Sequence, residues 1–305
     1  MSKLHNLFGL ALLALAFLAP VSADAANRVW VGGTGNFSDT AHWSLTSGGA
    51  GGQTVPGSGD AVIVDNNAAG LNGGTLTVDQ TVNVQSISLG TANGTINFGS
   101  NNVAVSSFVS FSGSGTRTIN MGSGTWTLTT SGGGTIWDVT TTTSLVPTFQ
   151  NAALVFTGAT AAVRTFVGGA QTYGSLTVAD NSSKNLFAIS GANTFASVTI
   201  GSGTLLQVPQ AATTTISGAL AMNGTSSAQS GLITSNTANI ATVSVGSAST
   251  ITWAGIYGIT RAGAGTLDAT CSFDMGRNSS FTSLTFVGAS CGGSGGGSHV
   301  IGSGT

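Results

Sequence analysis

The sequence predicts an all-β protein, namely a single-stranded parallel β-helix (β-solenoid) of about ten coils behind an N-terminal cap. Three observations point to this fold class. From Leu71 onward, Val, Ile, Leu and Phe alternate with Ser and Thr over short stretches that end at Gly or Asn, which is the pattern of strands bounded by turns. A six-residue pattern recurs along the same region. Charged residues make up only 5% of the chain and Glu is absent, which excludes long amphipathic helices with charged outer faces.

The recurring hexad reads apolar, any small or polar residue, Ser or Thr, apolar, Ser or Thr, apolar. Its copies begin at Val84, Tyr173, Phe195, Ile240 and Phe281. Their intervals are close to multiples of roughly 20 to 22 residues, a repeat length typical of proteins that wind one coil per repeat. The two best copies align without a gap over 171–178 and 193–200. We therefore assign residues 71–290 to the coils. A β-sandwich is the alternative, but its internal repeat would be about 100 residues.

Residues 1–25 have the features of a cleavable signal peptide. Lys3 precedes a continuous apolar run from Leu7 to Ala19, and Ala23-Asp24-Ala25 supplies the small-x-small cleavage pattern. The run is shorter than the roughly 18 residues that cross a bilayer, so a retained membrane anchor is the less favoured alternative. We expect a mature chain that begins at Ala26, has no transmembrane segment, and is secreted or displayed on the cell surface.

The chain contains two cysteines, Cys271 and Cys291. In an oxidising compartment such a pair can close a disulfide. If a coil has about 20 residues here, the two lie at equivalent positions of neighbouring coils, with Cα atoms about 4.8 Å apart, which a disulfide can span. The sequence predicts a disulfide that clips the terminal coils, with two buried thiols as the alternative. Residues 291–305 are interpreted as a Gly-rich tail or an incomplete last coil.

Residues 26–70 form an aromatic, Gly-rich segment that precedes the assigned coils. Trp30, Phe37 and Trp43 are its large apolar side chains. A solenoid must shield its first coil from water and its strand edges from pairing with other chains. The sequence therefore predicts that these three residues cap the open end. An aromatic platform for sugar rings is the alternative.

Within this segment, residues 29–65 begin Val-Trp-Val-Gly-Gly-Thr-Gly-Asn-Phe-Ser-Asp-Thr-Ala-His-Trp-Ser and continue to a Pro-x-x-x-Asp-x-Val turn. The stretch resembles the W-V-G-G-x-G-x-W-S-D-x-x-x-W-S opening of repetitive secreted β-solenoid surface proteins. These include bacterial adhesins, autotransporter passengers and similar phage virion proteins. Phe37 stands where Trp is usual. Residues 164–178 and the unit at 193–200 resemble the filamentous repeats of the same proteins. The resemblance implies surface display with adhesive or structural roles, and it carries no catalytic residues.

Few residues are arranged for chemistry. His42 and His299 are the only histidines of the expected mature chain, and neither belongs to a metal-binding pattern, so no catalytic, cofactor-binding or metal-binding residue is predicted. A net charge of −2 offers no basic patch for nucleic acid. The paired carboxylates Asp60 with Asp65 and Asp268 with Asp274 could in principle act as acid and base on a glycosidic bond. Asp as a turn residue is the favoured interpretation.

These observations predict a secreted, non-catalytic structural or adhesive β-solenoid, without cofactors, that contacts surfaces, glycans or copies of itself through many weak contacts. The alternative is a polysaccharide-active β-helix, a lyase or glycoside hydrolase, that uses one of the Asp pairs.

Overall fold

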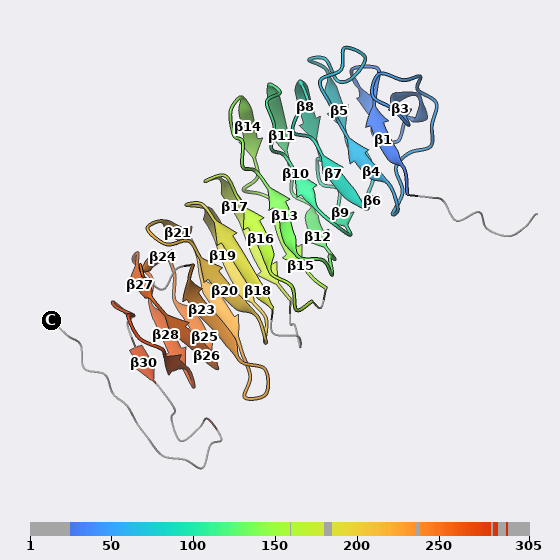
Figure 1. Cartoon of the computed structure of the whole chain (residues 1–305). Coiled ribbons are helices and arrows are strands. Elements are labelled where there is room, and N and C mark those ends of the chain that lie inside the picture. The colour runs from blue at the N-terminus through green and yellow to red at the C-terminus, as the bar shows by residue number, and fades with distance from the viewer. Residues whose placement is uncertain are drawn as a thin grey trace, which may run out of the picture.

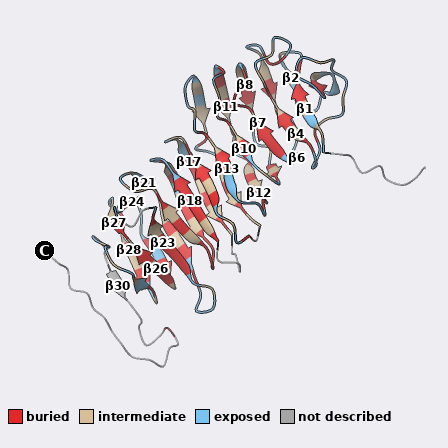
Figure 2. Cartoon of the chain, in the orientation of Figure 1, coloured by how far each residue is buried: buried red, intermediate tan, exposed pale blue. Residues whose placement is uncertain are grey.

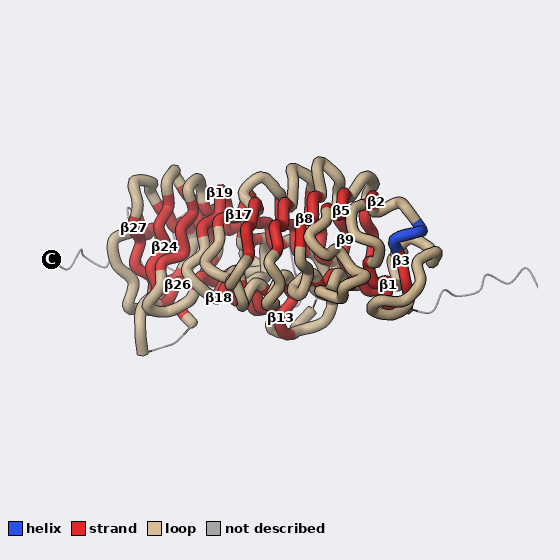
Figure 3. The backbone as a smooth tube through the Cα atoms, turned by 90° about the horizontal axis from the view of Figure 1, so that it is seen from above, coloured by secondary structure: helices blue, strands red, loops and turns tan. Residues whose placement is uncertain are grey.

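The chain winds as a parallel β-helix whose coils stack into a rod (Figures 1 and 3), and the predicted fold class is therefore confirmed. Nearly all regular structure is strand, and the one short helix of the described residues is a 3-10 turn, η1 (Thr40–His42). The computed structural model describes residues 25–158, 160–179, 185–235, 238–281, 283–285 and 291. The predicted signal peptide and the segment 292–305 lie outside these ranges, except for Ala25.

Three faces run along the rod, and each coil contributes strands to them in turn. The first face is one sheet that contains β1 (Asn27–Trp30), β4 (Ala61–Ile63), β7 (Ser86–Ser88), β10 (Val109–Ser110), β13 (Gly134–Asp138), β16 (Arg164–Val167), β18 (Leu186–Ser190), β20 (Leu205–Val208), β23 (Ser230–Thr234), β26 (Ala254–Tyr257) and β29 (Phe273–Asp274). Neighbouring strands of this series pair in parallel, while β3 (Trp43–Ser44) adds an antiparallel strand beside β1.

The second face begins as a separate sheet of β2 (Gly35–Asn36), β5 (Thr75–Thr77), β8 (Gly94–Asn97), β11 (Arg117–Asn120) and β14 (Leu145–Thr148), and is completed later by β21 (Thr213–Ile216), β24 (Ala241–Val245) and β27 (Ile259–Ala262). The third face contains β6 (Val82–Val84), β9 (Val103–Val105), β12 (Thr125–Leu128), β15 (Ala153–Phe156), β17 (Thr172–Val178), β19 (Thr194–Ile200), β22 (Leu220–Asn223), β25 (Ser249–Thr252), β28 (Leu267–Thr270) and β30 (Ser283–Thr285). Strand β19 joins the two faces, because its first residues pair with β21 and its last with β22.

The core is a set of in-register columns of apolar side chains inside the rod. Buried residues, red in Figure 2, occur in strands along the whole rod. One column of the third face consists of Val84, Val105, Leu128, Phe156, Val178, Ile200, Met222, Ile251 and Ala269. Between the faces, Tyr173 stacks on Phe149 and Phe195 with ring centroids 5.4 and 5.6 Å apart. Since each coil buries its inner side chains only against its neighbours, stacking is what stabilises the strands.

The prediction of a regular coil of 20 to 22 residues is wrong for most of the rod. Asn27 pairs with Ala61, 34 residues further along, whereas Gly255 pairs with Phe273 after 18. Parallel pairing fixes the strands, but the turns between faces vary freely in length, because they lie on the surface. The solenoid also begins earlier than residue 71, since β1, β2 and β4 of the segment assigned to the cap pair in parallel with later strands.

The hexads share a local pattern but not a common place in the coil. Only the copies in β17 and β19 are equivalent: Tyr173 pairs with Phe195 and Val178 with Ile200. The copy at 84–89 spans the turn between β6 and β7, and the copy at 240–245 lies in β24 on the second face. Alternation identifies a strand, but it does not identify the face to which the strand belongs.

A disulfide joins Cys271 and Cys291, with a Cα–Cα distance of 5.6 Å. Cys271 directly follows β28, and the next strand of that sheet is β30. The two cysteines are not equivalent in register, because Thr270, which precedes Cys271, pairs with Thr285. The predicted disulfide is therefore present, but the two cysteines do not occupy equivalent positions of neighbouring coils.

We expect the double variant Cys271→Ser/Cys291→Ser to lose local stability at this end of the rod. A disulfide that closes a 20-residue loop contributes about 2 to 3 kcal/mol. Amide hydrogen exchange should accelerate in β28, while β17 and β19 in the middle of the same sheet keep their protection, because each coil contacts only its neighbours. Unchanged exchange in β28 would contradict a clipping role.

Candidate functional site

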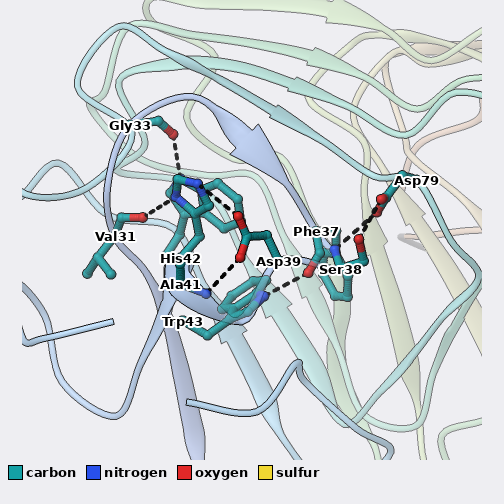
Figure 4. Close-up of polar contacts among 10 residues, drawn as sticks. Val31, Gly33, Phe37, Ser38, Asp39, Ala41, His42, Trp43 and Asp79 are labelled. Atoms are coloured by element: carbon teal, nitrogen blue, oxygen red, sulfur yellow. Dashed lines mark hydrogen bonds and ion pairs between the residues drawn. The ribbon is translucent and has the colours of Figure 1, made fainter. Parts of the chain in front are cut away.

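The aromatic residues of the N-terminal segment form a cluster at the first coil (Figure 4). Trp30 ends β1 and Trp43 begins β3, and the two residues pair directly across this antiparallel contact. Their rings meet edge to face at 5.1 Å, and Phe37 meets Trp43 in the same way at 5.0 Å. Trp30 and Trp43 have no exposed surface, and Phe37 is 2% exposed. These side chains cannot form a platform for sugar rings, because no face of theirs reaches solvent.

Hydrogen bonds fix the orientation of each ring. The indole Nε1 of Trp30 donates to the carbonyl of Gly33 (2.9 Å), and that of Trp43 donates to the carbonyl of Phe37 (2.8 Å). Buried indoles normally require such a partner. Both partners lie in the Gly-rich loop around β2, so the indoles tie this loop to β1 and β3.

His42 completes the cluster and is a structural residue of the loop. Its imidazole stacks on Trp30 at 4.6 Å, and its Nδ1 lies 2.7 Å from the carbonyl oxygen of Val31. Its Nε2 lies 3.8 Å from a carboxylate oxygen of Asp39. A Cβ atom at Gly35 would collide with this ring. The glycine therefore makes room for the histidine, and the burial and contacts of the cluster support the predicted capping role.

The carboxylate of Asp60 is buried and already has three donors. It accepts bonds from the backbone N–H of Ala26 (3.1 Å) and Gly57 (2.9 Å), and its Oδ2 lies 3.3 Å from Nε of Arg28. Strand β4 lies between it and Asp65, whose Oδ1 accepts a bond of 3.1 Å from the backbone N–H of Asn67. Both carboxylates therefore accept hydrogen bonds from nearby backbone groups, as Asp residues in turns do.

The second pair is divided between two faces of the rod. Asp268 lies in β28 on the third face, and Asp274 ends β29 on the first face. Asp274 accepts bonds of 2.7 Å from the backbone N–H of Gly276 and from Nδ2 of Asn278. These contacts are those of a turn residue, as the favoured interpretation of the sequence has it.

Two buried arginines have a role that sequence reasoning missed. Arg117 is 1% exposed and donates five hydrogen bonds to backbone carbonyls of four residues, Phe111, Gly115, Thr141 and Thr143. Arg164, equally buried, donates to the carbonyls of Thr157 and Gly158, and its guanidinium lies 5.8 Å from the centre of the Phe187 ring. Burial lowers the pKa of both arginines from the usual value, although an arginine remains charged in proteins. The sequence did contain a signal for this role. Each arginine stands two residues before an apolar residue, in 117–119 and 164–166, and side chains two residues apart in a strand point to the same side, here the inner one.

The second face carries a continuous outward column of short polar side chains, which we call the polar ladder. Parallel pairing aligns Asn36, Thr77, Asn97, Asn120, Thr148, Thr172, Thr194, Thr215, Ser244 and Ala262. All are uncharged, and all but Ala262 bear a hydroxyl or amide. They alternate with inward residues, for example Leu76 beside Thr77 and Phe195 beside Thr194. A second outward column, two residues earlier in the strands, holds Thr75, Thr95 and Thr118.

A shallow pocket of about 380 Å³ lies where the aromatic cluster meets the next coil. It is lined by Gly32, Gly33, Thr34, Ala68, Ala69, Gly70, Leu71, Asn72 and Gly74. The amides of Gly32 and Gly33 are already bonded to the carbonyls of Ala69 and Gly70. The lining offers no charged group.

The chain matches no family model, no curated protein and no solved structure. Within the described ranges, no helix is long and apolar enough to span a membrane, and no three His, Cys, Asp or Glu residues are grouped so as to hold a metal ion.

Proposed function

We propose that the chain is a secreted, non-catalytic β-solenoid with an adhesive or structural role at a surface, and that the polar ladder contacts glycans. The ladder is the observation that carries the proposal. It extends over ten strands at a spacing of about 4.8 Å, and each Thr or Asn can both donate and accept hydrogen bonds. Glycan hydroxyls do the same, so a chain of sugars laid along the rod would meet a matching group at every coil.

The expected strength of binding comes from repetition. A single exposed hydroxyl contributes little, because the contact replaces a hydrogen bond to water. Contacts repeated on one rigid scaffold raise the effective concentration for each following contact, which increases the overall affinity. The lack of charge in the ladder favours a neutral polysaccharide over a polyanion.

Export is supported by three separate features. Residues 1–25 have the pattern of a signal peptide, the disulfide suits an oxidising compartment, and residues 29–65 resemble the opening of secreted surface solenoids. The placement of the Asp residues argues against the polysaccharide-active alternative, because Asp60 is already paired with Arg28 and Asp268 lies on a different face from Asp274.

The test is binding of the mature chain to insoluble neutral polysaccharides, with a soluble polyanionic polysaccharide for comparison. The triple variant Thr172→Val/Thr194→Val/Thr215→Val removes three ladder hydroxyls and keeps β-branched side chains that suit strands. Its matched control, Thr177→Val/Thr199→Val/Thr250→Val, changes outward residues of the third face, two of them on the same strands β17 and β19. We expect the ladder variant to bind about tenfold more weakly, and the control to bind as the wild type does.

Two results would count against the proposal. The first is a wild-type chain that binds none of the polysaccharides. The second is the appearance of new chain ends in the polysaccharide during incubation, which would restore the enzymatic alternative.

A further inference from the structure

The outward side of the first face changes character along the rod. In its N-terminal half it presents Ser88, Ser110 and Asp138, and the hydroxyl of Ser110 donates to the Asp138 carboxylate (3.1 Å). In its C-terminal half, strands β18 to β29 present large apolar side chains instead. Exposed apolar groups that are contiguous, rather than scattered, mark contact surfaces.

Two adjacent outward columns make up this surface. One contains Leu186, Leu205, Gly231, Gly255 and Phe273, and the other contains Ala188, Gln207, Ile233, Tyr257 and Met275. We call the six large apolar residues among them (Leu186, Leu205, Ile233, Tyr257, Phe273 and Met275) the C-terminal apolar patch. Their strand neighbours Leu206, Leu232 and Ile256 are buried inside the rod, which fixes the patch as the outer side. Phe273 is 47% exposed and Met275 60%, whereas Leu186, Leu205, Ile233 and Tyr257 are half-buried.

Two glycines keep the patch flat. A Cβ atom at Gly255 would strike the sulfur of Met275, and one at Gly231 would approach the side chain of Leu205 closely. The side chains of Met275 and Leu205 therefore pack over the backbone of Gly255 and Gly231. A flat apolar sheet face of this kind is the surface that packs against a second sheet, at about 10 Å, in β-sandwiches.

The size of the patch limits the strength of the contact. Five strands spaced by about 4.8 Å and about three residues of about 3.3 Å across give roughly 240 Å². A stable interface buries about 800 Å² on each partner, so the patch can form an apolar centre that a polar rim must complete. Ser190 and Ser235, which are short, uncharged and exposed, lie at its margin.

We infer that the C-terminal apolar patch is a contact surface between two copies of this chain. The ten residues of the two columns are uncharged, so two copies can meet through the same patch without like-charge repulsion. In such a dimer a two-fold axis relates the two copies, and the rods run antiparallel. Only their C-terminal halves overlap, because full overlap would bury the Asp138 carboxylate of each copy. The product is an elongated dimer with both aromatic caps at its far ends. The inference goes beyond the proposed function, since self-association requires no glycan.

The test measures the mass of the mature chain by light scattering and sedimentation from about 1 µM to several hundred micromolar. We expect a reversible dimer with a dissociation constant in the micromolar range, as suits an interface with a small apolar centre. The variant Ile233→Thr/Phe273→Thr/Met275→Thr should dimerise at least about tenfold more weakly. The control Leu45→Thr/Val146→Thr/Ile240→Thr removes exposed apolar groups outside the patch and should leave the dimer intact.

Oxidation of Met275 by dilute peroxide, followed by mass spectrometry, gives a second readout on the unmodified chain. Its rate should fall as the dimer forms, while the buried Met222 stays slow throughout. A wild type that remains monomeric over the whole range overturns the inference, as does equal weakening by the control variant. Protection of Met275 in the monomer would mean that another segment of the same chain covers the patch. None of these outcomes affects the glycan assay.

Discussion

Replacement of Trp43 by Ala is expected to lower the free energy of unfolding by about 4 kcal/mol. The side chain is fully buried, packs edge to face on Trp30 and Phe37, and holds the Gly-rich loop through its bond to the Phe37 carbonyl. Truncation of a buried aromatic residue to Ala typically costs about 3 to 5 kcal/mol. Urea denaturation followed by tryptophan fluorescence and circular dichroism measures the change.

The same variant should also expose the end of the first face. Strand β3 covers β1 through the pairs Val29 with Ser44 and Trp30 with Trp43. Loss of the indole loosens β3, and an uncovered β1 offers its backbone groups to other chains. We expect concentration-dependent aggregation of Trp43→Ala and none of the control Leu45→Ala, whose side chain is 49% exposed. A stability loss below about 1 kcal/mol, without aggregation, would show that Trp43 is not part of a cap.

The sequence was sufficient to predict the class of fold because stacked strands require alternating apolar residues and, where they pair directly, similar residues at paired positions. Strands that bury one side show strict alternation, and Tyr173–Val178 and Phe195–Ile200 match residue by residue because they pair directly. The same reasoning failed for coil length. The segments between faces, such as 64–74 between β4 and β5, lie outside the strands and are not held to a constant length, so the spacing of residues in the sequence does not give the register of the strands.

The polar ladder was harder to predict from the sequence than the aromatic cluster. Trp30, Phe37 and Trp43 are conspicuous in a Gly-rich stretch, and their burial follows from their size. The polar ladder, by contrast, exists only once parallel pairing has placed Thr77 beside Asn97 and Thr194 beside Thr215. No local feature distinguishes these residues from Thr177 or Thr199 on another face, because both sets alternate with apolar neighbours. The face on which a residue lies depends on the path of the whole coil.

Replacement of Arg117 by Leu is expected to cost about 4 kcal/mol, because the guanidinium donates to the carbonyl groups of the buried residues Phe111 and Gly115 and to two further carbonyls that are partly buried. It donates to Phe111 and Gly115 in its own coil and to Thr141 and Thr143 in the next, so a single side chain ties two turns together. Leu fills part of the space but leaves the oxygens without these donors, and each buried acceptor left unsatisfied costs about 1 to 3 kcal/mol.

Arg117→Lys tests the geometry rather than the charge. Lys keeps the charge but has three donors on one nitrogen, which cannot reach carbonyls arranged for a planar fork, so we expect it to recover less than half of the loss. Hydrogen exchange should accelerate in β11 and β14, which pair directly, before it does so in the distant β26. The exposed Arg277 provides the control, and Arg277→Leu should change the free energy of unfolding by less than about 1 kcal/mol. An Arg117→Leu variant as stable as the wild type would show that the turn carbonyls obtain other donors, and that the inner arginine is dispensable to the stack.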